Sequence, residues 1–250
     1  MKLTAPSTNN GSLTAETKDW QFGFDKVFTE TSSQEDVFGE VSQLVQSALD
    51  GYKVCLFSYG QTGSGKTYTM LGGQGDSKGI IARSVEKIIG ASKCLEKKGW
   101  SYKMEACFIE IYNETVRDLL QPGTAHSQKY SIQNPKSAGG CPFVAGVLRE
   151  PVDSVEAANS LVRRASAARA VEATQMNDTS SRSHTIFMLY ITGIHKDAGQ
   201  RLEGCLNLVD LAGSERLSRS GAEGKRLKET CAINKSLSSL GDVFTAISAR

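Results

Sequence analysis

The sequence lacks both a long apolar run and an excess of charge of one sign. Its 250 residues carry 29 Lys and Arg against 27 Asp and Glu, a formal net charge of +2. This balance gives no general attraction to nucleic acid or to an acidic membrane surface. No apolar run is long enough to span a bilayer, and no repeats, heptad arrays or low-complexity blocks occur. We therefore expect neither nucleic acid nor a membrane among the partners.

Cysteine pairs at metal-binding or redox spacing are also absent. The six cysteines are scattered, and none forms a C-x-x-C pair. Several lie in apolar runs typical of strands, where a free cysteine behaves as a small hydrophobic side chain. This usage favours a reducing intracellular compartment over a secreted disulfide framework. No apolar segment after Lys2 indicates a signal peptide.

What is present is a mixture of helix and strand patterns. The first 19 residues, rich in Ser, Thr and Asn, predict a poorly ordered arm or a hairpin. Periodicity predicts helices over 34–49, 67–70, 79–95, 153–171 and 232–250. Buried or alternating runs predict strands over 54–59, 102–111, 183–196 and 201–212, the last two forming a hairpin. The fold class is therefore α/β, with a central mixed sheet flanked by helices in three layers.

Several local details follow from the same patterns. Ser33 is a plausible N-cap for the first long helix, and Asp153 with Glu156 a capping pair for the fourth. The segment "NETVRDLL" after the strand at 102–111 predicts one or two helical turns. The last helix has an apolar stripe that should pack on the sheet, formed by Ile233, Leu237, Leu240, Phe244 and Ile247.

A glycine-rich loop joins the strand at 54–59 to the short helix at 67–70. Its sequence fits G-x-x-x-x-G-K-[ST], with Gly60, Gly65, Lys66 and Thr67 at the defining positions. Glycines let backbone N–H groups turn toward phosphate oxygens, Lys66 should reach the β- and γ-phosphates, and Thr67 should ligate Mg²⁺. The predicted phosphate loop comprises Gly60, Gln61, Thr62, Gly63, Ser64, Gly65, Lys66 and Thr67. A chance lysine in a glycine-rich turn is the alternative, but the flanking strand and helix favour phosphate binding.

Two further motifs could complete such a site. In "LNLVDLAGSE", Asp210 ends an apolar strand, where a phosphate-loop fold holds its metal; alone, it could simply cap the next turn. In "NDTSSRSH", at 177–184, hydroxyls could contact γ-phosphate and Mg²⁺, and the arginine could pair with a carboxylate. By itself this segment is equally compatible with a polar loop, and a lone His184 is more often structural than catalytic.

Together these motifs resemble one family. "SYGQTGSGKTYTM", "NDTSSRSH", "LVDLAGSER" and "INKSLSSLGDV" are similar to the P-loop (60–67), switch I (177–184), switch II (210–215) and the start of the relay helix (232–250) of the kinesin motor domain. "FGFDKVF" and "FIEIYNETVRDLL" also match, so the resemblance runs from about Trp20 to Arg250 in the family's order. The wording is most similar to the kinesin-14 branch.

The resemblance implies roles for individual residues. Ser180 and Ser181 would contact γ-phosphate and Mg²⁺, with Asn177 supporting their loop. Gly213 would offer its N–H to γ-phosphate. Arg182 and Glu215 would form a salt bridge that closes the two switches over the attacking water. The metal ligands would be Thr67, Ser181 and Asp210.

The resemblance also implies activity, cofactors and partners. The protein would be a microtubule-based motor ATPase that uses ATP and Mg²⁺ in the cytoplasm, associated with the cytoskeleton. Asn234 would link switch II to the track-binding surface, and the basic loop before the relay helix would contact the microtubule through Lys225, Arg226 and Lys228. A homodimer would form through segments outside this chain.

The chain also departs from the family pattern. No R-x-R-P motif, which walls the adenine, precedes Trp20, so Tyr68 would be the remaining adenine wall. The chain stops at Arg250 inside an apolar-periodic helix. We therefore expect residues 20–250 to be a motor domain truncated at both ends, with impaired motor activity.

Two other functions use the same motifs. A P-loop GTPase would read guanine with N-K-x-D, but the only "NK", at Asn234, is followed by Ser236 and Leu237. A microtubule-binding module that has lost hydrolysis is the other alternative. The intact "GSGKT", "SSRSH" and "DLAGSE" argue against it.

Overall fold

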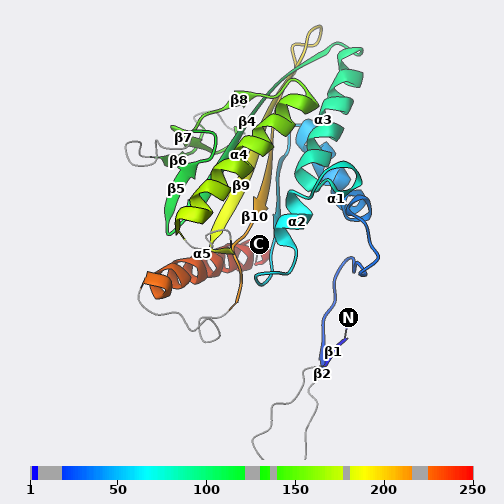
Figure 1. Ribbon diagram of the computed structural model, residues 1–250. Helices are drawn as coiled ribbons and strands as arrows, with labels where there is room; N and C mark the ends of the chain where they lie inside the picture. The colour runs from blue at the N-terminus through cyan, green and yellow to red at the C-terminus, as the bar shows by residue number, and fades with distance from the viewer. Residues whose placement is uncertain are drawn as a thin grey trace, which may run out of the picture.

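A mixed β-sheet forms the centre of the molecule. The computed structural model describes residues 2–4, 19–121, 130–135, 140–176, 181–215 and 225–249. The strand order is β3-β10-β9-β4-β5, and β8 also pairs with β4 (Figure 1). The bounds are β3 (Lys53–Ser58), β10 (Arg201–Asp210), β9 (Ser183–His195), β4 (Trp100–Tyr112), β5 (Thr115–Asp118) and β8 (Glu150–Pro151). Among these strands β3 and β10 pair in parallel and the other pairs are antiparallel.

Helices cover both faces of this sheet (Figure 1). The helices are α1 (Gln34–Leu49), α2 (Lys66–Met70), α3 (Ile80–Glu96), α4 (Val155–Met176) and α5 (Lys225–Ser248), with a 3-10 turn η1 (Gly75–Ser77). α1, α3 and α4 enclose the larger apolar core against one face. A smaller core lies on the other face, beneath the paired strands β6 (Ser131–Gln133) and β7 (Phe143–Ala145). The expected three-layer α/β fold is confirmed.

The start of α1 follows its sequence. Ser33 Oγ accepts a hydrogen bond from Asp36 N at 3.1 Å, and the Asp36 carboxylate accepts one from Ser33 N at 2.8 Å. These two bonds satisfy N–H groups that a helix end leaves without intrahelical partners. Val45 and Leu49 are buried, whereas Leu44 is 47% exposed at the edge of the expected apolar stripe. The N-cap prediction at Ser33 is confirmed.

The helical turn expected after β4 is wrong. The chain instead makes a tight hairpin, and β5 returns antiparallel to β4 with Tyr112 opposite Thr115. The two loop residues, Asn113 and Glu114, have φ of 48° and 61°. Positive φ at both central residues is the property of the turn that best matches strand twist in a two-residue hairpin. Val116 therefore lies in a strand, and Leu119 and Leu120 follow the end of that strand as buried residues.

Two helix starts also differ from expectation. The N-cap contact of α4 comes from Ser154, whose Oγ accepts a hydrogen bond from Ala157 N at 3.1 Å, and not from Asp153. α5 begins at Lys225, well before the expected start at residue 232. The basic run expected in a loop therefore lies in the first turn of α5.

The apolar stripe of α5 packs over only part of its length. Ile233 is buried and Leu237 and Leu240 are half-buried, but Phe244 and Ile247 are 40% and 60% exposed. Phe244 still meets Phe57 of β3, with ring centroids 5.2 Å apart. The stripe is thus buried along the first half of α5, and its ring contact with β3 lies in the second half.

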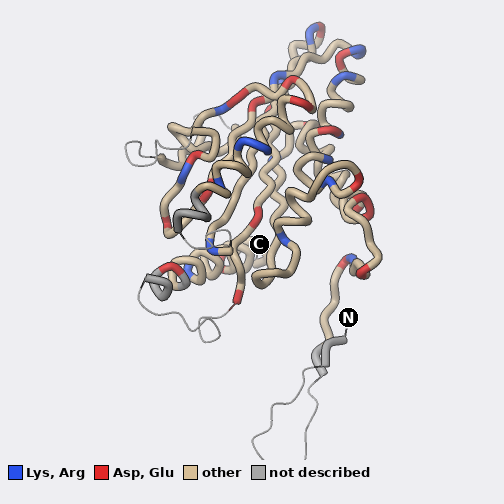
Figure 2. Tube along the Cα trace, viewed as in Figure 1, with Lys and Arg blue, Asp and Glu red and all other residues tan. Residues whose placement is uncertain are grey.

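The ends of the expected N-terminal arm form a small separate pair, β1 (Lys2–Thr4) with β2 (Asp19–Gln21). The rest of that segment lies outside the described residues. Within the described part of the chain, none of the helices has the length and hydropathy needed to cross a bilayer. Figure 2 shows acidic and basic residues interspersed along the described chain, in keeping with the small net charge.

Candidate nucleotide-binding site

The loop between β3 and α2 is shaped by its glycines. Gly63 and Gly65 have φ of 80° and 91°, which side chains with a Cβ rarely adopt. Gly65 sits at the N-cap position of α2, so that Lys66 and Thr67 open the helix. The strand, glycine loop and helix predicted around residues 60–67 therefore have the arrangement that a phosphate loop requires.

A cavity of about 300 Å³ lies beside this loop. It is lined by Thr62, Gly63, Gly65, Lys66, Thr67, Tyr68, Ser181 and Leu211. The structure thus brings Ser181 of switch I to the P-loop across a long separation in sequence. Tyr68 is 58% exposed at the cavity, so its ring is accessible for stacking against a planar ligand group. Leu211 was missed, because an apolar residue after a strand gives no signal of ligand contact.

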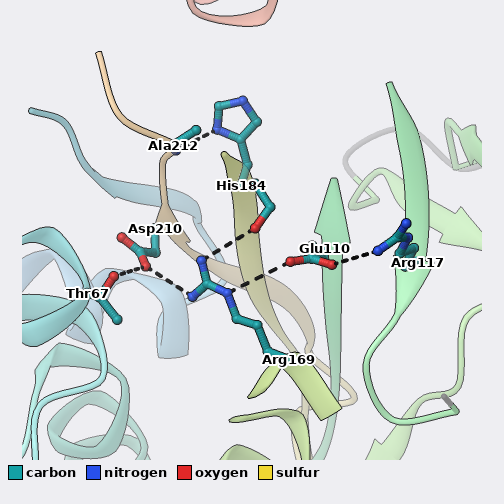
Figure 3. Close-up of polar contacts among 8 residues, drawn as sticks. Thr67, Glu110, Arg117, Arg169, His184, Asp210 and Ala212 are labelled. Atoms are coloured by element: carbon teal, nitrogen blue, oxygen red, sulfur yellow. Dashed lines mark hydrogen bonds and ion pairs between the residues drawn. The ribbon is translucent and has the colours of Figure 1, made fainter. Parts of the chain in front are cut away.

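Asp210 meets the P-loop directly at the end of β10 (Figure 3). Thr67 Oγ1 donates to Asp210 Oδ2 at 2.6 Å, and Ser58 Oγ donates to Oδ1 at 3.2 Å. Asp210 is 4% exposed, so these hydroxyl groups replace water around a buried carboxylate. The strand-end carboxylate and the P-loop threonine therefore form one unit.

Lys66 is directed back over its own loop. Its Nζ donates to the carbonyl oxygen of Gln61 at 2.9 Å. Lys66 also lines the cavity, so its ammonium group places a positive charge beside the space enclosed by the loop. Such a cation is suited to the β- and γ-phosphates of a nucleotide.

Switch II closes against the P-loop through Glu215. Its carboxylate accepts hydrogen bonds from Thr62 N at 2.9 Å and from Thr62 Oγ1 at 2.5 Å. Burial raises the pKa of Glu215, but the bonds from Thr62 outweigh burial and leave the pKa below its ordinary value. Glu215 is therefore an ionised group held beside the cavity.

Gly213 packs between both switches and the P-loop. Its N–H donates to the Ser181 carbonyl at 2.9 Å, not to an open space, and any Cβ at this position would collide with Thr62 and Glu215. Ser214 N donates to the Gly60 carbonyl at 3.0 Å. Only glycine fits the close approach of switch II to residues 60–62.

The expected salt bridge between Arg182 and Glu215 is not formed. Arg182 pairs instead with Glu229 of α5, with Nη1 and Oε2 3.0 Å apart. Glu215 is occupied by Thr62, and the early start of α5 brings Glu229 alongside switch I. Glu229 also accepts a bond from Tyr112 Oη at 2.7 Å, and burial together with this bond raises the pKa of Tyr112 to about 12. Glu229 was not expected at the site, since it lies in the run that the sequence predicted to be a basic loop.

His184 joins three elements. Its Nδ1 accepts a bond from Ala212 N at 3.1 Å, and its Nε2 lies 2.8 Å from Ser236 Oγ on α5. The Ser236 hydroxyl donates to the Ile233 carbonyl at 2.7 Å, so the ring must donate from Nε2. Burial lowers the pKa of His184, partly opposed by Asp210. A neutral His184 therefore ties β9 to switch II and to α5.

Some expected site residues fall outside the described structure. Asn177 and Ser180 are among the residues that it does not describe, and the side chains of Lys225, Arg226 and Lys228 are likewise outside it. Asn234 is half-buried within α5. In the described parts of the chain no group of three or more His, Cys, Asp or Glu side chains could hold a metal ion. A metal here would depend on hydroxyl oxygens together with Asp210.

The fold and this site define a P-loop protein of the α/β class. Residues of switch I and switch II both approach the P-loop. A family model described as "Kinesin motor domain" matches residues 2–250. The chain belongs to the kinesin motor domain family.

Individual relatives agree with this assignment. The rice "Kinesin-like protein KIN-14N" is 53% identical over 245 residues, covering 95% of this chain and 32% of that protein. The chain thus spans about a third of the length of this relative. Among solved structures, the motor and motor homology domain of Kar3Vik1 fused to a synthetic coiled coil has a TM-score of 0.82 at 42% identity, covering 97% of this chain and 59% of that one. The motor domain of the Kar3-like kinesin from Ashbya gossypii has a TM-score of 0.77 at 41% identity, covering 97% and 68%.

Proposed function

We propose that this chain binds ATP with Mg²⁺ in the P-loop cavity, and that the protein couples ATP hydrolysis to binding and movement along microtubules. The observation that carries the proposal is the convergence of Thr67, Asp210 and Glu215 on one loop. Phosphoryl transfer requires positioned charges and hydrogen-bond donors more than covalent chemistry by the protein. This cavity has both.

Five residues that line or adjoin the cavity have roles in this proposal. Lys66 would leave the Gln61 carbonyl and bind the β- and γ-phosphates, and Tyr68 would stack on the adenine. Ser181 and Gly213 would donate to the γ-phosphate after giving up their mutual backbone bond. Glu215, held ionised by Thr62, would help to position the attacking water.

The donor set fits Mg²⁺. Thr67 and Ser181 contribute hydroxyl oxygens at the cavity, and Asp210 is a carboxylate bonded to Thr67; hard oxygen ligands of this kind suit Mg²⁺. When bound, Mg²⁺ neutralises charge that develops on the phosphates. Since Asp210 is occupied by the Thr67 and Ser58 hydroxyls, its part is to orient Thr67 and to accept hydrogen bonds around the metal.

Two contacts would carry the state of the site to α5. Arg182 of switch I holds Glu229, and His184 joins Ala212 of switch II to Ser236. If ordering of the switches around a phosphate moves Arg182 or Ala212, the contacts of these segments with α5 change directly. We assign α5 to the microtubule side on family membership, which also favours a place in the cytoplasm on the cytoskeleton.

The test is nucleotide turnover by the purified protein with ATP and with GTP, each with and without microtubules. We expect turnover of ATP that microtubules stimulate, with weaker turnover of GTP. Binding of ATP without turnover would favour a microtubule-binding module that has lost hydrolysis. A preference for GTP would overturn the proposed nucleotide.

A further inference from the structure

A row of polar side chains crosses the sheet at the level of Asp210. The strand register pairs Ser58 with Asp210, Asp210 with Thr185, Thr185 with Glu110, and Glu110 with Arg117. Residues paired across neighbouring strands point to the same face, and the apolar neighbours of this row belong to the core under α1, α3 and α4. Two carboxylates are thus buried on the face covered by α1, α3 and α4, Glu110 at 1% exposed and Asp210 at 4%.

Arg169 of α4 reaches down between these two carboxylates (Figure 3). Its Nη1 lies 3.4 Å from Asp210 Oδ2, and its Nε lies 3.8 Å from Glu110 Oε1. Its Nη2 donates to Ser183 Oγ at 3.5 Å. Arg169 is itself only 8% exposed. The guanidinium group therefore bridges two strands that lie on either side of β9.

The two carboxylates do not depend on Arg169 equally. Glu110 has a second cation, Arg117, with Nη1 and Oε2 3.6 Å apart. The one ion pair that Asp210 makes among the described residues is with Arg169; its other contacts are the hydroxyls of Thr67 and Ser58. Buried charges are costly unless paired, and removal of one partner leaves the other uncompensated. Loss of Arg169 would therefore act mainly on Asp210.

We propose that Arg169 is a positioning residue for the metal-dependent step of nucleotide binding. By fixing Asp210 Oδ2, it keeps that oxygen turned toward the Thr67 hydroxyl, so that Thr67 presents its lone pairs to Mg²⁺. Glu110 and Arg117 hold the guanidinium from the other side. This inference rests on the proposed Mg-nucleotide function and adds α4 to the elements that control the site.

The test separates this role from simple charge balance by four variants: Arg169→Met, Arg169→Lys, Glu110→Gln and the double variant Arg169→Met/Glu110→Gln. Arg164→Met is the control, because Arg164 lies on the same helix and pairs with Glu150 at 2.8 Å, away from Asp210. Two quantities are measured in the protein: the thermal midpoint without nucleotide, and the ratio of mant-ATP Kd values in EDTA and in Mg²⁺.

We expect Arg169→Met to lower the thermal midpoint and to reduce the Mg²⁺-dependence of mant-ATP affinity by about 10–100-fold, the usual effect of removing a partner of a metal-site ligand. Arg169→Lys should restore part of that dependence, and Arg164→Met should leave it unchanged. The double variant should recover part of the thermal midpoint, since the buried row then holds one carboxylate, Asp210, and one cation, Arg117, but it should not recover the Mg²⁺-dependence.

The inference is overturned if the double variant recovers both quantities, because Arg169 would then only balance charge. It is also overturned if Arg169→Met folds and keeps the Mg²⁺-dependence of the unchanged protein. Absence of Mg²⁺-dependent binding in the unchanged protein would overturn the proposed function itself, and this outcome is visible before any variant is compared. Because the double variant restores the balance of buried charge in the row, the comparison stands even if Arg169→Met alone does not fold.

Discussion

Arg182 of switch I and Glu229 of α5 form an ion pair, with Nη1 and Oε2 3.0 Å apart and both side chains mostly buried. Glu229 is also held by Tyr112 Oη, whereas Glu215 of switch II is held by Thr62. Switch I is thus joined to α5, and switch II to the P-loop. In this arrangement the two switches meet each other through the Gly213–Ser181 backbone bond and through the bond from Ala212 N to His184 Nδ1.

This arrangement predicts which carboxylate is coupled to Arg182 without nucleotide. Arg182→Ala and Glu229→Ala should show a coupling of about 0.5–1 kcal/mol in the free energy of unfolding, a modest value because both side chains keep some solvent contact. Arg182→Ala and Glu215→Ala should be additive in the same urea unfolding experiment. Coupling to Glu215 with additivity at Glu229 would mean that the pair implied by the family resemblance forms without nucleotide.

The parts of the fold that the sequence predicted are those where local pattern and tertiary packing agree. The capped helix after Ser33 and the hairpin of β9 and β10 are examples, because apolar periodicity and turn residues both point to one structure. The hairpin at Asn113 was missed, since "NETVRDLL" has spacing compatible with either helix or strand. Two positive φ values decide that case, and they are not visible in the pattern.

The residues of the candidate site also fall into those that local sequence predicts and those that depend on tertiary packing. The place of the glycine loop between a strand and a helix, and of Asp210 at a strand end, could be predicted, because contiguous motifs mark both. Arg169 and Glu229 could not, because their partners are distant in sequence and depend on strand register or on where α5 begins. The pairing of Arg182 with Glu229 depends on the packing of α5, which the local sequence does not reveal.

The loop cation Lys66 should contribute directly to nucleotide affinity. Lys66→Ala should weaken mant-ATP binding by about 10–100-fold, the equivalent of about one charge-assisted hydrogen bond. Lys97→Ala is the control, because Lys97 is exposed at the end of α3 and far along the chain from the loop. Unchanged affinity in Lys66→Ala would contradict the assignment of residues 60–67 as the phosphate loop.

A third prediction separates binding from turnover. Glu215→Ala should leave mant-ATP affinity within about threefold, since Glu215 binds Thr62 and not the loop glycines. The same variant should lower the rate of phosphate release by at least about 100-fold, as expected for a group that positions the reacting water. The measurement pairs equilibrium binding with single-turnover phosphate release. Normal turnover would remove Glu215 from the proposed mechanism; a matching loss of affinity would give it a structural role in the loop.

The last prediction concerns His184 and pH. Burial lowers its pKa below 6.5, so in the window just below that value the unfolded chain binds a proton more readily than the folded one. The contribution of His184 to the free energy of unfolding is therefore complete above pH 6.5 and is lost as the pH falls. The hydrogen-bond geometry also predicts that protonation destabilises the fold, because a protonated Nδ1 would face the Ala212 N–H instead of accepting from it.

Urea unfolding at pH 7.5 and pH 5.5 measures this loss, and His184→Gln provides the comparison. A glutamine can accept from Ala212 N and donate to Ser236 Oγ, but it does not titrate. The unchanged protein should lose more stability than His184→Gln between the two pH values, by at most about 1.4 kcal/mol per pH unit for one proton. His195→Gln, a change at the other end of β9, controls for loss of a histidine as such. Equal losses in all three proteins would show that His184 binds its proton as easily in the folded state, and that its neutral form is not what joins switch II to α5.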